Sequence, residues 1–516
     1  MSQVLHIFRK DVRHLWIEVS LSWVALALLG RMNWLQASPH NDFRWIYETQ
    51  SYFVMFVVFA WWIVIARVIQ DESLVGDRQF WVTRPYEWKN LLAAKVLFVV
   101  AVIYLPALVL YLFLLKLAGY PVLGRVAEIL KVTGGTTLFL ALPVAAFAVL
   151  TRKLSHWLMI VFGVVLLFFT TAGLTFYFGE SHYSGEEGIY GTLQWTAVLA
   201  LLCVVILIQY ARRRPLRATL FLILAFLIIP AIGAVIPYEK LLERQFPLST
   251  TRPLQLEIAA SSRGTTSSYP AMRTTFVSLP VAVSGIAGGN VVSVRATFAT
   301  IDTAGGTHWA SGWQSMSYDL DSNTTKTQLG FWIDRKTYDN LKSQPSHVRL
   351  VLAMTELRES GEQRVVAQPT FTLPKVGLCW ISSFPGSVSA STIECRSDGT
   401  GPRNLSMMLT KDQGGRNVGT DGNSRLNGGT FQILNHQGGG LNSIVPLSKR
   451  TFYFGGWDPT RPDLRPMIFP GTPLTFRTYD PFRSSRVQYD FGTIRLADYE
   501  LQAGQTGAIG IDVAPH

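Results

Sequence analysis

The C-terminal half of the chain contains no long apolar stretch. Crossing a bilayer takes roughly 20 mostly apolar residues as a helix, and no such run follows Pro237. Membrane spans are therefore not expected in residues 238–516. The first 237 residues are the opposite, because they are built around seven apolar stretches. We expect the two parts to fold in different solvents, the first in lipid and the second in water.

The sequence also lacks the motifs that would give it catalytic chemistry. It contains no GxxxxGK[ST] phosphate loop, no HExxH metal motif and no GxSxG nucleophile motif. Its nine histidines are scattered, with no pair at metal-ligand spacing. We predict that the chain is not an enzyme and holds no cofactor or metal. Any hydrolysis of ATP would have to occur on another chain.

Charged side chains are missing from the middle of the apolar stretches, and the last two stretches carry no charge at all. Ion-driven transporters keep ionisable groups at that depth, because a costly buried charge carries the coupling. Their absence disfavours a transporter that works without an external energy source.

Cysteine is scarce, with three residues in the whole chain. Cys203 lies inside an apolar stretch and is interpreted as a small packing residue. Cys379 and Cys395 lie 16 positions apart in the C-terminal half. In an oxidising compartment a bond between them would contribute about 3 kcal/mol in the chain-entropy account. Two free thiols are the alternative.

The seven apolar stretches are each long enough to cross a membrane. They cover residues 17–35, 52–69, 93–118, 132–150, 156–178, 192–210 and 218–236. Any one of them would also suit the buried helix of a large soluble protein. Seven in succession, separated by short polar links, instead predict a transmembrane helical domain over residues 17–237.

The net charge of +12 is explained by membrane topology. With the N-terminus inside, the inner links of the first part hold 14 Lys and Arg and the outer links hold 5. This asymmetry is the positive-inside pattern, so the charge is not an indication of nucleic-acid binding. An odd number of spans then places residues 238–516 outside. We predict an integral protein of a bacterial cytoplasmic membrane, in contact with membrane lipid.

Residues 1–16 are expected to form a helix lying on the membrane surface. Apolar residues recur at helical spacing from Val4 to Trp16, and Arg9, Lys10 and Arg13 lie mostly on the other side. An apolar stripe beside a basic face suits the layer between headgroups and acyl chains. Trp34, at the end of the first stretch, is typical of the aromatic residues at that layer.

After Pro237 the pattern changes to period two. Leu254–Ile258, Val291–Phe298 and Val348–Leu352 alternate apolar and polar side chains, with Gly-, Ser- and Thr-rich links between them. This predicts antiparallel sheets packed as sandwiches, with one helical insert at Arg335–Lys342. The fold class is thus an α-helical transmembrane bundle of about seven spans followed by an all-β, sandwich-like domain over 238–516. Two subdomains joining near Pro374 are an alternative to one.

The link between the second and third stretches mixes charges of both signs with large aromatic residues. Its notable residues are Asp71, Glu72, Gly76, Asp77, Arg78, Phe80, Trp81, Thr83, Arg84, Pro85, Trp88 and Lys95. Aromatic and Arg side chains supply most of the binding energy at protein interfaces, so the link is suited to docking on a partner. An amphipathic connector on the membrane is the alternative.

This link resembles the cytoplasmic coupling region of type-2 ABC exporter permeases. The features that recur in that order are Glu72, Gly76, Phe80 with Trp81, Thr83-Arg84-Pro85, and Lys95 at the start of the next span. The helix ending at Trp16 resembles the elbow helix of the same family. The resemblance covers roughly residues 1–210, and the seventh span and the large outer domain are additions to the usual six spans.

The resemblance implies a permease that forms a homodimer or heterodimer and is driven by a separate cytoplasmic ATPase. Binding of ATP by the partner would move the coupling link and switch the helices between inward and outward access. A membrane-anchored sensor or assembly protein, whose outer β domain binds a partner, is the alternative.

Overall fold

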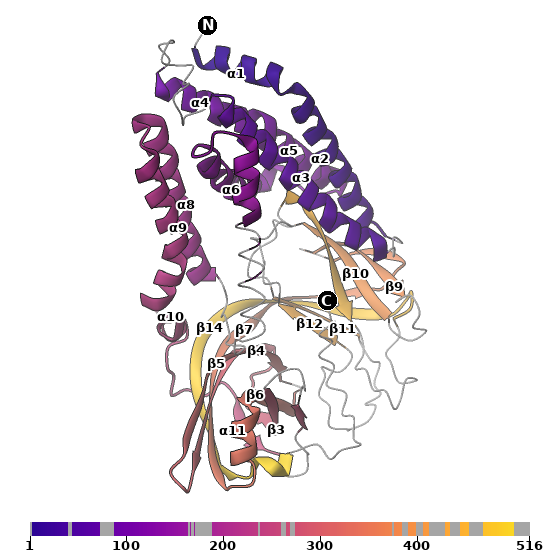
Figure 1. The fold of residues 1–516 in the computed structure, drawn as a ribbon. Coiled ribbons are helices and arrows are strands. Elements are labelled where there is room, and N and C mark those ends of the chain that lie inside the picture. The colour runs from indigo at the N-terminus through magenta and orange to yellow at the C-terminus, as the bar shows by residue number, and fades with distance from the viewer. Residues whose placement is uncertain are drawn as a thin grey trace.

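The chain folds into a helical part and a β-rich part, which the computed structural model in Figure 1 shows one above the other. The structure describes residues 3–39, 44–72, 87–163, 166, 170, 188–235, 238–259, 265–268, 274–322, 324–373, 376–383, 391–398, 406–411, 429–433, 444–453 and 468–499.

The helical part is built from long apolar helices with short connections. Its elements are α1 (Gln3–His14), α2 (Trp16–Gln36), α3 (Arg44–Gln70), α4 (Trp88–Val99), the π-helix η2 (Val100–Tyr104), α5 (Leu105–Leu117), the 3-10 turn η3 (Leu123–Arg125), α6 (Val126–Ala148), α8 (Gly188–Arg212), α9 (Pro215–Val235) and α10 (Tyr238–Gln245).

Four helical segments in the described part are long and apolar enough to cross a membrane. They are Thr49–Gln70, Trp88–Leu117, Leu123–Ala148 and Leu193–Arg212. They match the predicted stretches 52–69, 93–118, 132–150 and 192–210. The pair α1 and α2, bent by 74° at Leu15, is a fifth candidate. The sequence pattern is therefore confirmed as far as these segments.

The remaining stretches leave the count of seven a prediction. Most of 156–178 lies outside the described residues. The last stretch forms α9, which qualifies as a shorter apolar helix over Pro215–Ile228. Cys203, predicted to pack inside the bundle, is instead exposed on α8, because a small apolar residue also suits a helix face directed toward lipid.

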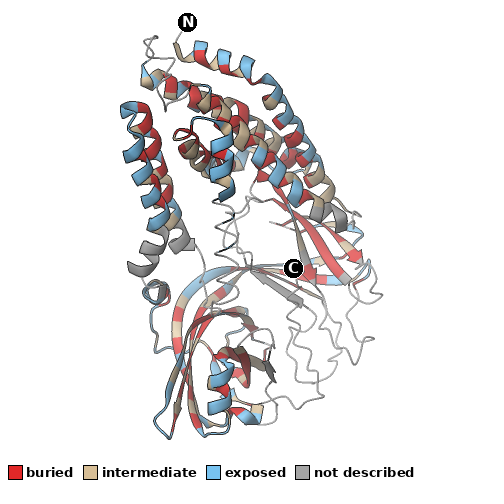
Figure 2. Cartoon of the chain, viewed as in Figure 1, coloured by how far each residue is buried: buried red, intermediate tan, exposed pale blue. Residues whose placement is uncertain are grey.

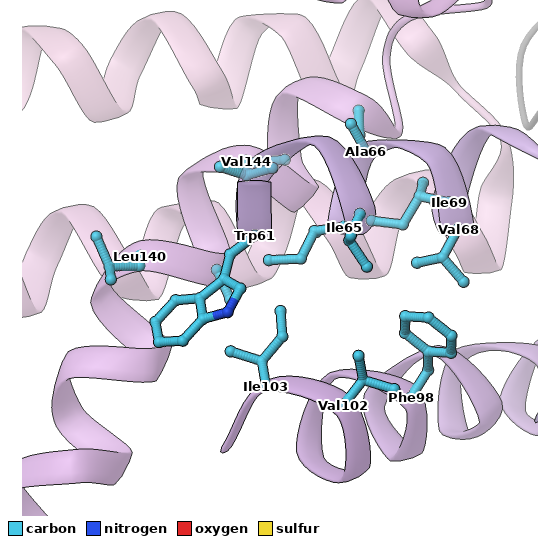
Figure 3. Close-up of a cluster of buried hydrophobic side chains, with 14 of the residues drawn as sticks. Trp61, Ile65, Ala66, Val68, Ile69, Phe98, Val102, Ile103, Leu140 and Val144 are labelled. Atoms are coloured by element: carbon cyan, nitrogen blue, oxygen red, sulfur yellow. The ribbon is translucent and has the colours of Figure 1, made fainter. Parts of the chain in front are cut away.

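The bundle core is formed where α3 packs against α4, η2 and α6. Figure 3 shows Trp61 and Ile65 of α3 facing Ile103 and Phe98, with Leu140 of α6 beside the indole ring. The side chain of Trp61 is buried. Packing these apolar side chains together stabilises the bundle, because many weak dispersion contacts add up over the buried area.

Pro106 shapes the long helix that runs from Trp88 to Leu117. Proline has no backbone N–H, so the carbonyl four residues earlier, that of Val102, loses its helical donor. Trp23 of α2 supplies the replacement, because its Nε1 donates to the Val102 carbonyl at 2.9 Å. The π-helical turn η2 lies at the same point. A neighbouring helix thus satisfies the backbone group that proline frees, as membrane interiors require.

The β-rich part contains three antiparallel sheets. Its elements are β1 (Gln255–Ile258), β2 (Thr265–Ser268), β3 (Thr274–Ser284), β4 (Asn290–Thr303), β5 (His308–Asp321), β6 (Lys326–Asp334), α11 (Arg335–Leu341), β7 (Ser346–Val366), β8 (Thr370–Leu373), β9 (Gly377–Ser383), β10 (Ser391–Asp398), β11 (Ser406–Lys411), β12 (Gly429–Ile433), β13 (Leu447–Tyr453), β14 (Pro473–Ile494) and the 3-10 turn η6 (Leu496–Tyr499). The three alternating runs and the helical insert that the sequence predicted are all present.

Two very long strands organise these sheets. β7 and β14 pair from Ser346 opposite Ile494 to Val366 opposite Pro473, within the sheet of order β12-β11-β14-β7-β4-β5. One end of this pair packs against β3, β6 and α11, and the other against the sheet of order β13-β10-β9-β8. Among the described residues, the β-rich part therefore has two large cores that share one sheet and a smaller buried cluster where α10 packs against β4, β5 and β7. Residue 374 lies outside the described residues.

The second core contains a disulfide. Cys379 of β9 and Cys395 of β10 are directly opposite each other in the strand register, and their sulfur atoms are bonded. Both side chains are buried, as Figure 2 shows for much of this sheet. The bond fixes β9 to β10 in the sheet whose strand β13 contacts α2.

Candidate functional site

The helix α1 presents one buried face to the bundle, and this face carries a charge. Ile7 and Asp11 of α1 and Leu15 just after it recur four residues apart, so they share one side of the helix, and all three are buried. Lys10 lies on an exposed side. Asp11 is thus an acidic side chain on a face that the sequence predicted to be apolar.

Lys95 of α4 is the partner of Asp11. Its Nζ lies 2.8 Å from Asp11 Oδ2 and 3.2 Å from Glu72 Oε2, and the two side chains of the first pair are 4% and 0% exposed. Lys10 Nζ lies 2.8 Å from the other oxygen of Glu72. We name these four residues, Lys10, Asp11, Glu72 and Lys95, the ionic junction. Two cations face two carboxylates, so the cluster is neutral as a whole.

Burial and the two lysines act in opposite directions on the carboxyl groups. Burial raises the pKa of Asp11, and the attraction of Lys95 offsets only part of this effect. Burial alone would also raise the pKa of Glu72, but Lys95 and Lys10 together outweigh it and hold that pKa below its usual value. Glu72 is therefore ionised at neutral pH, and its charge stabilises both ammonium groups.

The ionic junction joins three elements that are distant in sequence. Glu72 follows α3, Lys95 lies two turns inside α4, and Lys10 and Asp11 belong to α1. Residues 73–86, the centre of the predicted coupling link, lie in the sequence between Glu72 and the start of α4. The helices at both ends of this link are thus tied to α1 by one charged cluster.

The structure describes four of the twelve residues predicted for the coupling link. Glu72 and Lys95 are in contact, Asp71 lies 3.5 Å from His14, and half-buried Trp88 begins α4. The other eight lie outside the described residues: Gly76, Asp77, Arg78, Phe80, Trp81, Thr83, Arg84 and Pro85.

The sequence indicated that Lys95 begins the third span, whereas in the structure it does not begin the helix. The helix begins at Trp88, where Glu87 has extended backbone geometry, and its first turns are polar enough to be missed by an apolar window. Lys95 therefore lies inside the helix and is buried. This position is what allows it to reach Asp11 and Glu72 together.

A second site joins the bundle to the β-rich part, and no sequence motif marks it. Asn33, buried near the end of α2, makes two hydrogen bonds to the backbone of Leu447 in β13. Its Nδ2 donates to the Leu447 carbonyl at 2.8 Å, and its Oδ1 accepts from the Leu447 N–H at 3.3 Å. The side-chain amide thus satisfies backbone groups of β13 as a neighbouring strand would.

Arg396 of β10 reaches the same end of α2. Its Nε donates to the carbonyl of Ala37 at 2.6 Å, and its guanidinium lies 4.4 Å from the centre of the Trp34 ring. The hydroxyl of Tyr120, which follows α5, donates to the Arg396 carbonyl at 2.7 Å. Burial raises the pKa of Tyr120 to about 12, so this hydroxyl remains a donor at physiological pH.

Gly377, the first residue of β9, allows this close approach. Its φ is +125°, and a Cβ at this position would collide with the Tyr120 hydroxyl and the Arg396 carbonyl. We name Asn33, Tyr120, Gly377, Arg396 and Leu447 the docking junction. Its hydrogen-bonded partners are 276 to 414 residues apart in the chain, which is why local sequence patterns did not reveal it.

Comparison with known proteins assigns no family to this chain. No protein-family model matches it, and no curated protein matches it significantly. Among crystal structures, the red sea bream transglutaminase is similar at 11% identity over 47% of this chain and 31% of that chain, with a TM-score of 0.14. The chain thus spans about a third of the transglutaminase, and a similarity this slight carries no argument.

Replacing Lys95 should destabilise the bundle strongly. Lys95→Met leaves the buried Asp11 carboxylate without its cation, and breaking a buried pair in this way costs about 3–5 kcal/mol. The exposed Lys116 in the last turn of α5 provides a matched control, since Lys116→Met should cost less than about 0.5 kcal/mol. The free energy of unfolding can be measured by denaturant titration of the full chain in detergent.

The pair can be isolated by a double-mutant cycle. Asp11→Asn combined with Lys95→Met should cost about 1–3 kcal/mol less than the sum of the two single changes, because the second change removes the charge that the first left unpaired. Strictly additive costs would contradict the contact.

The docking junction can be tested at Gly377. Gly377→Ala should lower the free energy of unfolding by about 2 kcal/mol more than Gly471→Ala. Both glycines have positive φ, but a Cβ at Gly471 would meet no atom within 4 Å. The difference therefore isolates the collision with Tyr120 and Arg396. Equal losses in the two variants would show that Gly377 matters for its backbone conformation alone.

Proposed function

We propose that this chain is the permease subunit of an ATP-driven ABC transporter of the exporter kind, energised by a separate cytoplasmic ATPase. The observation that carries the proposal is the ionic junction. Glu72 and Lys95, which flank residues 73–86, are in contact with each other and with α1. A link held at both ends in this way is suited to receive force from a partner.

A path for that force runs through the bundle. Displacement of residues 73–86 would move α3, α4 and α1 as a unit, because charges buried together separate only at high cost. α4 continues through η2 into α5, and Tyr120 after α5 is bonded to Arg396 of the β-rich part. Movement at one end of the bundle would therefore reach the β-rich part at the other.

We also propose seven spans, with the N-terminus inside and residues 238–516 outside. The excess of basic residues in the inner links supports this orientation. The disulfide in the β-rich part supports it too, since such bonds persist in oxidising compartments. Pairing of two permease chains, as a homodimer or heterodimer, is proposed from the family resemblance.

A membrane-anchored sensor is the second candidate, and the docking junction favours it. Asn33, Tyr120 and Arg396 connect the β-rich part firmly to α2 and α5. A partner bound by the β-rich part would then move these helices. The same connection serves a permease whose outer domain follows the transport cycle.

The proposed ATPase can be sought by purifying the tagged full chain from its own membrane in mild detergent. An ATPase with a phosphate loop should co-purify, and Phe80→Ala with Trp81→Ala should reduce its recovery by roughly tenfold or more. Phe469→Ala with Phe482→Ala is the control, because these aromatic residues are exposed on the β-rich part. Absence of any ATPase, or equal recovery from both double variants, would count against the permease.

The orientation predicts which cysteine substitutions an impermeant thiol reagent labels in intact cells. In a Cys203→Ser background, Lys336→Cys on α11 should be labelled directly. Lys153→Cys, between α6 and the following helix, should require permeabilised cells. Both lysines are exposed, so the access of the reagent to the two positions should differ only through the side of the membrane on which they lie. Labelling of Lys153→Cys but not Lys336→Cys in intact cells would overturn the orientation.

A further inference from the structure

A cavity of about 500 Å³ opens between the start of α4 and the end of α8. Its lining includes Trp88 and Lys89 from α4, together with Tyr210 and Arg212 from α8 and Arg213 just after it. Each wall is the end of a candidate membrane span. One of these spans begins at Trp88 and runs to Leu117, and the other begins at Leu193 and ends at Arg212. The cavity therefore lies at the depth where a bilayer has its headgroups.

The cavity is positively charged. Among the described residues, Lys89, Arg212 and Arg213 line it against a single acidic residue, Glu87. The local backbone brings the two arginines together. Arg213 has a φ of +49°, the left-handed conformation that ends many helices. Consecutive residues of a continuing helix would point about 100° apart, whereas this turn lets both arginines line one cavity.

Aromatic and apolar surfaces lie next to these charges. Tyr210 is buried in the cavity wall and Trp88 is half-buried beside it. The helix α9 begins just after the arginines, and Leu216, Leu220 and Leu224 recur along one of its sides with 81%, 65% and 45% of their surface exposed. Because α9 begins two residues after Arg213, its apolar surface, of the kind that contacts acyl chains, starts close to the basic cavity.

We propose that this cavity binds the phosphate headgroup of an anionic phospholipid, whose acyl chains lie along α9. Arginine suits this ligand because its planar guanidinium can form paired hydrogen bonds to phosphate oxygens. Basic pockets between transmembrane helices are a recognised way of holding acidic headgroups. A free phosphate compound would use the cations but would leave the leucines of α9 uncovered, so the lipid fits both parts of the surface.

The site borders the ionic junction. The helix α4 packs against α8, and Lys89 of the cavity lining and Lys95 of the ionic junction lie on the same helix, α4. A bound headgroup would therefore hold the ends of α4 and α8 together beside the cluster that fixes residues 73–86. This role is additional to the proposed transport function and does not depend on it.

The test compares lipid binding by the purified full chain and two double variants. Phosphatidylglycerol and phosphatidylcholine are titrated against the protein in detergent, with bound lipid counted by native mass spectrometry. Each basic side chain near an anionic lipid surface strengthens binding by roughly fivefold. Arg212→Gln with Arg213→Asn should therefore weaken phosphatidylglycerol binding by roughly 25-fold, and phosphatidylcholine should bind the unaltered chain weakly.

Arg152→Gln with Lys153→Gln is the matched control. These residues form another exposed basic pair beside the bundle, outside the cavity lining, and their loss should change the affinity less than about twofold. Lys89→Gln, on the other wall, should weaken binding by roughly fivefold and so separates loss of the site from local misfolding of α8.

Three results would overturn the proposal. Equal affinities for phosphatidylglycerol in the arginine variant and the control would show that the cavity is not the site. Equal binding of phosphatidylcholine would show that the charge is not recognised. Competition by glycerol phosphate or inorganic phosphate at millimolar concentration would assign the cavity to a soluble phosphate compound instead of a lipid.

Discussion

The ammonium group of Lys95 is the constraint on which the arrangement of the helices depends. A cation buried among apolar helices is stable only where carboxylates lie around it, and these come from α1 and from the end of α3. The requirement fixes where α1 turns, how α3 ends and where α4 starts. Apolar packing alone would allow these helices to slide past one another, because apolar contacts have no direction.

At the opposite end of the bundle, hydrogen bonds from side chains to backbone groups hold the helices to the sheet. Asn33, Tyr120 and Arg396 all bond to carbonyl or amide groups across the boundary between helices and sheets. Backbone groups cannot move without their whole strand, so these contacts hold the sheet of β9, β10 and β13 as one piece. The disulfide between β9 and β10 makes that piece stiffer, and β7 and β14 connect it to the core that contains β3, β6 and α11.

The ionic junction, the long helix, the docking junction and the paired strands β7 and β14 therefore connect α1 to the far end of the β-rich part. The long helix from Trp88 to Leu117 contributes Lys95 near one end, and Tyr120 follows its other end. Its one irregular point is η2, where Trp23 of α2 compensates for Pro106. A bend located there would change the angle between the two ends without breaking either junction.

Much of this could be predicted from sequence, because hydropathy and periodicity are local properties. They located four helices that are long and apolar enough to cross a membrane, the helix α1, the alternating strands and the insert α11. The two junctions could not be found in this way. Asp11 and Lys95 are 84 residues apart and Asn33 and Leu447 are 414 apart, and neither Asp11 nor Asn33 stands out from its neighbours in the chain. The sequence by itself determined which segments prefer lipid and which prefer water. Only the tertiary structure decided which polar groups meet, because burial creates the need for a partner and packing selects it.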